Sequence, residues 1–252
     1  MTQGTMEYYN QKLFGVRKET LERLETLYGK EYFSEDRYGR GAQQFSEEEQ
    51  RRQRMYRQEL ARIQHYVPHF AHGGNVLDIG CGTGAFLSLW GTTWQKYGIE
   101  LSDYASHCAR QRGVVTAFDP RDNFFDVIVF RGTLQHIPDP LYKISECYYW
   151  LKPGGAIIFL ATPNTHSPVY RLFQNLPMIK EPLNFLLPSD KMLLQILTNF
   201  GFKDIYFYYP YRGTPYAQPV KNIIAFALRL LRIKTKTNFA FFHNVLECYA
   251  RK

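Results

Sequence analysis

The sequence has few cysteines, and they are not arranged to hold a metal or a set of disulfides. Its 252 residues include four cysteines, and none belongs to a C-x-x-C pair or stands near a histidine at ligand spacing. Zinc sites and disulfide-rich secreted domains both require such groupings. We therefore expect reduced thiols and no metal site.

Long apolar runs and targeting signals are also missing. No apolar stretch reaches the roughly 20 residues that a membrane-spanning helix needs, and the opening residues, MTQGTMEYYN, lack the basic and apolar regions of a secretory signal. We therefore expect a cytoplasmic protein. With 252 residues, 45% of them hydrophobic, the chain can bury one sizeable core. Residues 1–252 are therefore expected to form a single domain.

Acidic residues are scarce in the last third of the chain. Residues 161–252 contain 12 Lys and Arg against 4 Asp and Glu, which accounts for the net charge of +8. This excess favours an anionic partner, although scattered basic residues are most often a solvated surface.

Part of this excess surrounds the apolar run 220–231, which is expected to be a helix. Such a helix is most often buried in a core or an interface. The alternative is that its basic edge holds a phosphate or an acidic lipid headgroup, with peripheral contact to a membrane. The cations around it are Arg212, Lys221, Arg229, Arg232, Lys234 and Lys236.

Short apolar runs alternate with longer mixed segments, which is typical of a parallel α/β sheet with helices on both faces. A capping box of Ser46 and Glu49 predicts the start of a helix that leads into the first strand. The runs expected to be strands are 75–79, 96–100, 114–118, 125–130, 156–161, 204–210 and 244–250. The later segments expected to be helices are 103–111, 139–151, 189–200 and 220–231.

Three glycines follow the first strand, at positions 80, 82 and 84 in the stretch VLDIGCGTGAF. Between a strand and a helix, glycines allow a sharp turn and the close approach of a ligand to backbone N–H groups. The G-x-G-x-G spacing differs from the G-x-G-x-x-G of dinucleotide sites, so it indicates a different nucleoside. Asp78 precedes the glycines, and Glu100 ends the next strand, where a carboxylate can accept both hydroxyls of a ribose.

Five motifs follow one another along the chain, and together they resemble the class I S-adenosylmethionine-dependent methyltransferases, most closely the broad bacterial group that acts on small molecules, lipids and glycans. They are V-L-D-I-G-C-G-T-G at 76–84, G-I-E-L-S at 98–102, F-D-V-I-V-F at 125–130, Q-H-I-P-D-P at 135–140 and L-K-P-G-G at 151–155. The resemblance implies an α/β, Rossmann-like sheet of seven mostly parallel strands with the last strand antiparallel.

The resemblance also implies a division of labour along the single methyltransferase domain. Residues 1–45 would be a segment that covers the cofactor, and 46–163 would be the cofactor-binding core. Residues 164–252 would form the acceptor side and the C-terminal strands, with an inserted helix.

The cofactor that the resemblance implies is S-adenosyl-L-methionine. The turn Gly80, Cys81, Gly82 and Gly84 would lie under its methionine part, with Asp78 near the ammonium group. Glu100 would take the ribose hydroxyls and Leu101 would lie against the adenine.

Three further residues have two readings each. Asp119 matches an acid that contacts the adenine amino group, but only four residues separate it from the next strand, so a turn residue is the alternative. Tyr38 and Tyr32 are the aromatic residues expected to fold over the cofactor, and core packing is their alternative.

The acceptor atom is expected to be oxygen, because Arg131-Gly132-Thr133 stands where methyltransferases of amide or base nitrogen carry N/D-P-P-Y/F. An oxygen acceptor must lose a proton, and a histidine is the natural base. His136 is the catalytic candidate, with a structural role in the cofactor loop as the alternative. His166 and His243 are weaker candidates.

The function expected is therefore a methyltransferase that acts on a small-molecule, glycan or lipid-linked acceptor. An RNA methyltransferase is an alternative, but no arginine cluster with interleaved stacking aromatics favours nucleic acid. A binding protein that keeps the cofactor site without catalysis is a second alternative. The sequence leaves the oligomeric state open.

Overall fold

The computed structural model describes residues 30–33, 42–174, 176, 184–211, 214, 217–233, 235 and 243–252. The described residues form one six-stranded sheet with the strand order β2-β1-β3-β4-β6-β5. Strands β1, β2, β3 and β4 run parallel. Strand β6 is antiparallel to both β4 and β5, as expected for the last strand. The strands are β1 Gly74–Ile79, β2 Trp94–Ile99, β3 Phe125–Arg131, β4 Leu151–Pro163, β5 Lys203–Tyr208 and β6 Val245–Arg251.

Seven strands were expected and the described residues form six, because the strand expected at 114–118 is reduced to a single bridge. Val115 pairs with the edge strand β2 through a single bridge to Tyr97, and its N–H and C=O bond Lys96 and Gly98. The pairing stops there because the chain reaches Pro120 and the short link to β3 almost at once, leaving no helix to cover the edge. Val115 is consequently 40% exposed.

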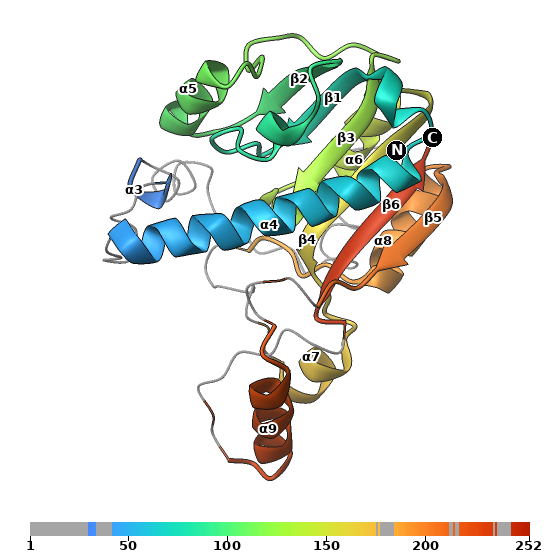
Figure 1. Cartoon of the computed structure of the whole chain (residues 1–252). Coiled ribbons are helices and arrows are strands. Elements are labelled where there is room, and N and C mark those ends of the chain that lie inside the picture. The colour runs from blue at the N-terminus through green and yellow to red at the C-terminus, as the bar shows by residue number, and fades with distance from the viewer. Residues whose placement is uncertain are drawn as a thin grey trace.

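Helices cover both faces of the sheet (Figure 1). On one face lie α4 (Ala42–Tyr66) and α5 (Asp103–Gln111), and on the other lie α6 (Pro140–Trp150) and α8 (Asp190–Asn199). Side chains of β3 alternate between the two layers: Val127 and Val129 belong to the cluster with α4, and Ile128 and Phe130 to the cluster with α6 and α8. This alternation is why residues 127–130 of β3 are apolar without a break.

Two local predictions about helices are wrong. The helix upstream of the first strand begins at Ala42, so Ser46 lies inside it and does not cap it. The residues before Ser46, Ala-Gln-Gln-Phe, include good helix formers, so nothing stops the helix from starting earlier. After the glycines, a three-residue 3₁₀ helix, η3 (Leu87–Leu89), stands in place of the expected α-helix.

The later helices agree with the sequence to within one or two residues. Ser102 caps α5 and Ser189 caps α8, each through a hydroxyl that accepts a backbone N–H of the first turn. The last helix is α9 (Pro219–Leu230), between β5 and β6. Together with α7 (Pro168–Phe173) it stands off the sheet, beyond the end of β4 (Figure 1).

Candidate functional site

The glycine turn (80–84) is shaped by positive φ angles and close packing. Its three glycines have φ of 79°, 54° and 75°. A Cβ on Gly80 would lie 2.5 Å from Thr133 Cγ2, and one on Gly84 would lie 3.1 Å from the Cα of Ala109. The turn is therefore held between α5 and the loop that follows β3, which is why side chains are excluded there.

Glu100 holds this turn from the end of β2. Its Oε2 accepts the Gly82 N–H at 2.8 Å, and its Oε1 accepts the Ser102 N–H at 2.9 Å. An ionised carboxylate has about four acceptor positions, so Glu100 can still accept hydroxyl groups of a ligand. The structure gives it a second role that the sequence did not show, because it fixes the backbone of the turn.

Asp78 is a buried carboxyl group that lacks a partner for one oxygen. It is 2% exposed, and its Oδ1 has no hydrogen bond from any described residue. Burial raises the pKa of Asp78 to about 7, although nearby Arg131 opposes this and Glu100 adds to it. A buried acceptor with no partner is costly, and a cationic ligand group would satisfy it.

The other predicted cofactor residues are less well placed for contact. The Sγ of Cys81 points toward β2, where a Cβ on Gly98 would lie 2.4 Å from it, so this thiol packs inside the protein. Burial also raises the pKa of Cys81, which disfavours a thiolate. Leu101 is 53% exposed beside Glu100, and Asp119 is exposed at the edge of the sheet.

An aromatic residue of the N-terminal segment lies over the glycine turn. Phe33, in α3 (Lys30–Phe33), would be 3.4 Å from a Cβ on Gly82, and the ring of Tyr32 packs edge-on against it with centroids 4.9 Å apart. Tyr38 lies outside the described residues. The position of α3 supports the idea of a covering segment, with Phe33 rather than Tyr32 nearest the turn.

His136 ends a short 3₁₀ helix, η4 (Leu134–His136), in the loop after β3. It is partly buried, and its Nε2 lies 3.2 Å from the Nε2 of Gln135. This loop also carries Thr133, which packs against Gly80. The structure therefore brings the loop of the catalytic candidate against the turn of the cofactor candidate.

A buried ion pair beside Asp78 was missed by the sequence analysis. Arg131, at the end of β3, donates to Glu59 of α4 from Nε at 2.7 Å and from Nη2 at 3.2 Å, and it lies 4.1 Å over the ring of Tyr56. Burial alone lowers the pKa of Arg131, but Glu59 outweighs it and raises the pKa above its usual value. A signal was available, because Glu59 lies on the apolar helix face that includes Tyr56 and Ile63.

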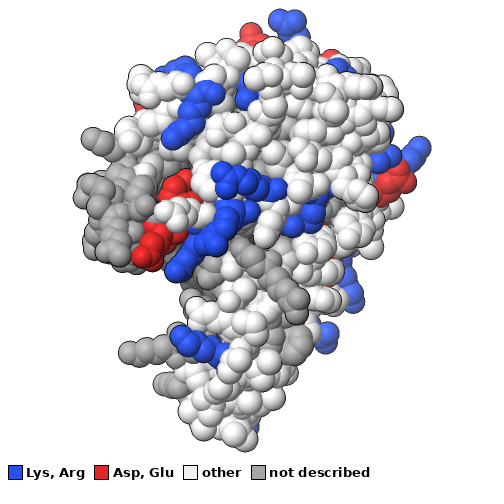
Figure 2. Space-filling model, in the orientation of Figure 1, with Lys and Arg blue, Asp and Glu red and all other residues white. Residues whose placement is uncertain are grey.

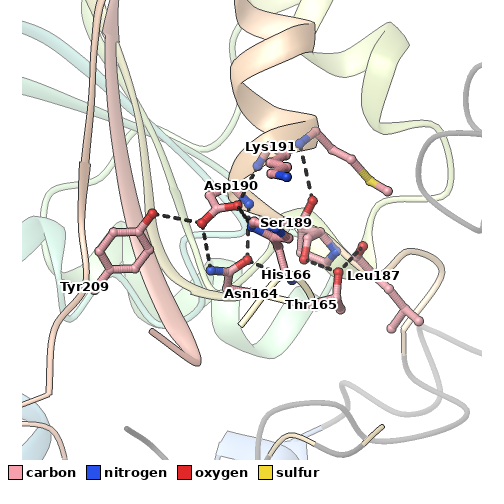
Figure 3. A network of polar contacts seen from close by, with 10 residues as sticks. Asn164, Thr165, His166, Leu187, Ser189, Asp190, Lys191 and Tyr209 are labelled. Atoms are coloured by element: carbon pink, nitrogen blue, oxygen red, sulfur yellow. Dashed lines mark hydrogen bonds and ion pairs between the residues drawn. The ribbon is translucent and has the colours of Figure 1, made fainter. Parts of the chain in front are cut away.

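A second polar network follows the end of β4 (Figure 3). Asp190 accepts from Tyr209 Oη at 2.8 Å and from Asn164 Nδ2 at 3.1 Å, and its Oδ1 lies 2.9 Å from His166 Nδ1. The ring of Tyr209 stacks on His243 with centroids 4.0 Å apart. Both of the weaker histidine candidates thus belong to one network.

This network fixes the orientation of His166. Partial burial would raise the pKa of Asp190, but hydrogen bonds from Tyr209, Asn164 and others lower it below its usual value. An ionised Asp190 accepts a hydrogen bond from the Nδ1–H of His166, so Nε2 is the acceptor when the ring is neutral. No described residue bonds that Nε2, and the His166 side chain is 33% exposed.

One stretch of chain links the two histidine loops. The Phe185 N–H donates to the Gln135 carbonyl at 2.8 Å, beside His136, and the Thr165 N–H donates to the Pro188 carbonyl at 2.9 Å, beside His166.

In the part of the chain that the structure describes, no cluster of His, Cys, Asp and Glu is arranged to hold a metal.

Comparison with known proteins gives a family and a fold. A model of the methyltransferase domain family matches residues 48–206. The chain is 33% identical over 114 residues to a ubiquinone biosynthesis O-methyltransferase of Thiobacillus denitrificans, a match that covers 40% of this chain and 49% of that protein. It is 31% identical over 118 residues to phosphoethanolamine N-methyltransferase 3 of Arabidopsis thaliana, covering 40% of this chain and 24% of that protein. The chain thus matches less than half of the length of these curated relatives.

Solved structures show the same fold. One is phosphoethanolamine N-methyltransferase 2 of Haemonchus contortus, in complex with phosphomonomethylethanolamine and S-adenosylhomocysteine. The match covers 78% of this chain and 53% of that chain, with a TM-score of 0.55 and 22% identity. The Rossmann-like methyltransferase fold that the motifs predicted is therefore confirmed, with six described strands in place of seven.

Proposed function

Because this chain belongs to the methyltransferase domain family, we propose that it transfers a methyl group from S-adenosylmethionine to an oxygen of a small-molecule, glycan or lipid-linked acceptor. The observation that carries this proposal is the Oδ1 of buried Asp78, which no described residue bonds and which stands next to the glycine turn and Glu100. A nucleoside with a cationic amino-acid part fits this set of groups.

Each end of such a cofactor has a matching group. Asp78 would pair with the ammonium group, Glu100 would accept the ribose hydroxyls, and Leu101 offers an exposed apolar side chain to the adenine. When bound, S-adenosylmethionine supplies a methyl group that its sulfonium already activates. The protein therefore needs mainly to hold donor and acceptor in line and to keep the site dry.

The acceptor side is proposed to lie in residues 164–252, which begin at the end of β4 and contact the loop that follows β3. An oxygen acceptor needs a base, and His136 is proposed first because its loop packs on the glycine turn. His166 is the second candidate, supported by its contact with Asp190. The relatives are named as an O-methyltransferase and an N-methyltransferase. Arg131-Gly132-Thr133 disfavours an amide or base nitrogen, and oxygen is proposed as the acceptor atom.

An anionic acceptor is also part of the proposal. The basic last third of the chain supports it, and one relative is named for phosphoethanolamine, which carries a phosphate. RNA is the alternative anionic acceptor. A salt titration of RNA binding would separate the two, because a phosphate backbone gives a steep salt dependence.

The test of the cofactor assignment is the variant Glu100→Ala. We expect S-adenosylhomocysteine to bind about 10- to 100-fold more weakly by calorimetry, because a charge-assisted pair of hydrogen bonds is lost. Since Glu100 also holds the Gly82 N–H, circular dichroism must show a folded variant. Asp103→Ala, one residue into α5, is the matched control and should bind normally. Equal affinity in Glu100→Ala would remove the assignment.

A further inference from the structure

The helix α9 carries a stripe of apolar side chains that face solvent. Among the described residues of 217–233, the α9 stripe comprises Val220, Ile223, Ile224, Leu230, Leu231 and Ile233, which are 49% to 72% exposed. These six are among the 14 large apolar side chains that the described chain exposes. Exposed apolar residues are ordinary when scattered, but a concentrated patch marks an interaction surface.

The spacing of the stripe follows the period of a helix. Positions 220, 223, 224 and 231 repeat at intervals of three, four and seven, which places their side chains along one side. The buried positions of the helix, Asn222 and Ala225, fall on the opposite side. Val220, Ile223, Ile224 and Leu231 therefore form one continuous face, and Leu230 and Ile233 lie at and just beyond the C-terminal end of the helix.

Contacts with the rest of the protein hold that face outward. Asn222 donates to the Tyr211 hydroxyl at 2.8 Å, and the ring of Phe226 packs edge-on against Phe173 of α7 with centroids 5.6 Å apart. Arg229 lies 5.3 Å over the same Phe173 ring. Because the polar and aromatic side is already occupied, α9 cannot bury its stripe by a simple rotation.

The charge around the stripe has one sign. Between Asp204 and Glu247 the sequence contains six Lys and Arg and no Asp or Glu. Of these cations, Lys221 and Arg232 are exposed at the two ends of α9. On the face that Figure 2 shows, the described residues of the lower lobe that contains α7 and α9 are blue and white, with none in red.

We propose that α9 is an interfacial helix that lays its stripe on a membrane surface containing anionic lipid. An apolar face flanked by cations, with no acidic residue, is what such surfaces select. Insertion across a bilayer is not involved, since no described helix is both long and apolar enough to cross one.

The same charges argue against a second copy of the chain as the occupant. Two α9 helices that packed stripe to stripe would bring their Lys221 and Arg232 side chains together. The segment offers no carboxylate to offset this repulsion. An anionic lipid surface both covers the apolar side chains and neutralises the cations.

A lipid surface at α9 would also position the proposed active site. The helix stands beyond the end of β4 (Figure 1), and Asn164 and His166 directly follow that end in the chain. This step rests on the proposed function: docking through α9 would bring the acceptor side close to the lipid headgroups, which favours a lipid-linked acceptor.

The test uses the full chain and co-sedimentation with two kinds of vesicle, phosphatidylcholine alone and phosphatidylcholine mixed equally with phosphatidylglycerol. We expect binding to the mixed vesicles only. Ile223→Ser with Ile224→Ser should abolish it at low and at moderate salt. Lys221→Gln with Arg232→Gln should weaken it roughly 30-fold at low salt, and by less as salt rises, because screening removes the same attraction.

The matched control is Leu194→Ser, which removes an apolar side chain of similar exposure (46%) from α8. It should bind vesicles like the unchanged chain. Sedimentation of each variant reports the oligomeric state. If the unchanged chain is a dimer that ignores both vesicles, and the Ile223 and Ile224 variant is a monomer, the stripe is an interface between copies and the membrane proposal is wrong.

Calorimetry with S-adenosylhomocysteine keeps the two proposals apart. The α9 variants should bind it with unchanged affinity, because α9 contributes nothing to the glycine turn. Vesicle binding without any binding of S-adenosylhomocysteine would overturn the proposed function and leave the interfacial helix standing. The reverse pattern would overturn the interfacial helix alone.

Discussion

At the scale of single residues, Asp78 is a group whose burial opposes folding. Its pKa is raised from 3.8 to about 7, mainly by desolvation. Between those two values the folded protein keeps a proton that the unfolded chain has released, so the unfolded state binds fewer protons. Stability therefore falls as pH rises from about 4 to about 7. The penalty is fully present above the folded-state pKa, where the carboxylate is ionised and buried.

The variant Asp78→Asn should remove this penalty and impair binding. At pH 8 we expect the variant to unfold at a higher temperature than the unchanged protein, with a gain of up to roughly 2 to 4 kcal/mol. At pH 5 the gain should be much smaller, since Asp78 is then neutral in the folded state. Thermal melts across this pH range measure the difference. A gain of equal size at both pH values would mean that ionisation of Asp78 is not its cause.

The same carboxyl group predicts how ligand affinity depends on pH. The ammonium group of S-adenosylhomocysteine prefers ionised Asp78, so its affinity should rise between pH 6 and pH 8. Asp78→Asn should bind at least about tenfold more weakly at pH 8 and lose that rise. Calorimetry at both pH values, with Asp126→Asn near the start of β3 as the control, separates this effect from a general effect of charge.

The two histidine candidates can be distinguished by their kinetics. If His136 is the base, His136→Asn should lower kcat about 10²- to 10⁴-fold with little change in cofactor affinity, and the loss should shrink at high pH as the acceptor ionises unaided. His166→Asn should then change KM more than kcat. If His166→Asn instead lowers kcat and His136→Asn changes mainly KM, His166 is the base, with Asp190 as its partner. Asp190→Asn supplies a check, because it should matter only in that second case.

At the scale of elements, the helix α4 is joined to β3 by the buried pair of Glu59 and Arg131. Their side chains are 3% and 14% exposed. Removing one partner of such a pair leaves an uncompensated charge, whereas replacing both with apolar residues is often nearly neutral. The pair also lies beside Asp78, so it fixes the charge around the proposed cofactor site.

We expect Arg131→Met to lower the free energy of unfolding by about 3 to 5 kcal/mol, and the double variant Glu59→Leu with Arg131→Met to recover most of this loss. Urea unfolding measures both. The control is Arg52→Ala, which breaks an exposed pair with Glu49 on the same helix and should cost about 1 kcal/mol or less. A double variant no more stable than the single one would show that packing, and not the unpaired charge, dominates.

The elements also show what the sequence could and could not predict. The positions of the glycine turn, Asp78 and Glu100 at strand ends were predictable because local spacing decides them, and their roles toward a cofactor stay predictions. The strand expected at 114–118 was wrong because pairing at a sheet edge depends on what covers it. The contact of His166 with Asp190 and the contact of Glu59 with Arg131 were missed because each joins distant segments, and no local period encodes such a pair.

At the scale of the whole molecule, the described chain has two units with separate apolar cores of unequal size. The larger unit is the sheet, which has one large apolar cluster on each face. The unit of α7 and α9 has a small cluster of its own, in which only Val169 and Ala225 are buried, packed by Phe173, Tyr211 and Phe226. Because burial of apolar area is the main source of stability, this unit should open without unfolding the sheet.

Hydrogen exchange can test this division, because a ligand protects only the amides that exchange through states unable to bind it. With S-adenosylhomocysteine at 100 times its dissociation constant, amides of β1 and β3 that exchange by global unfolding should gain about 2.7 kcal/mol of protection. Amides of α9 should gain almost none, since the opened α7 and α9 unit leaves the glycine turn and Glu100 intact and still able to bind. Mass spectrometry of peptides from β1 and from α9, with and without the ligand, measures both. Equal gains in the two peptides would mean that α9 unfolds only with the sheet, and that the molecule behaves as one cooperative unit.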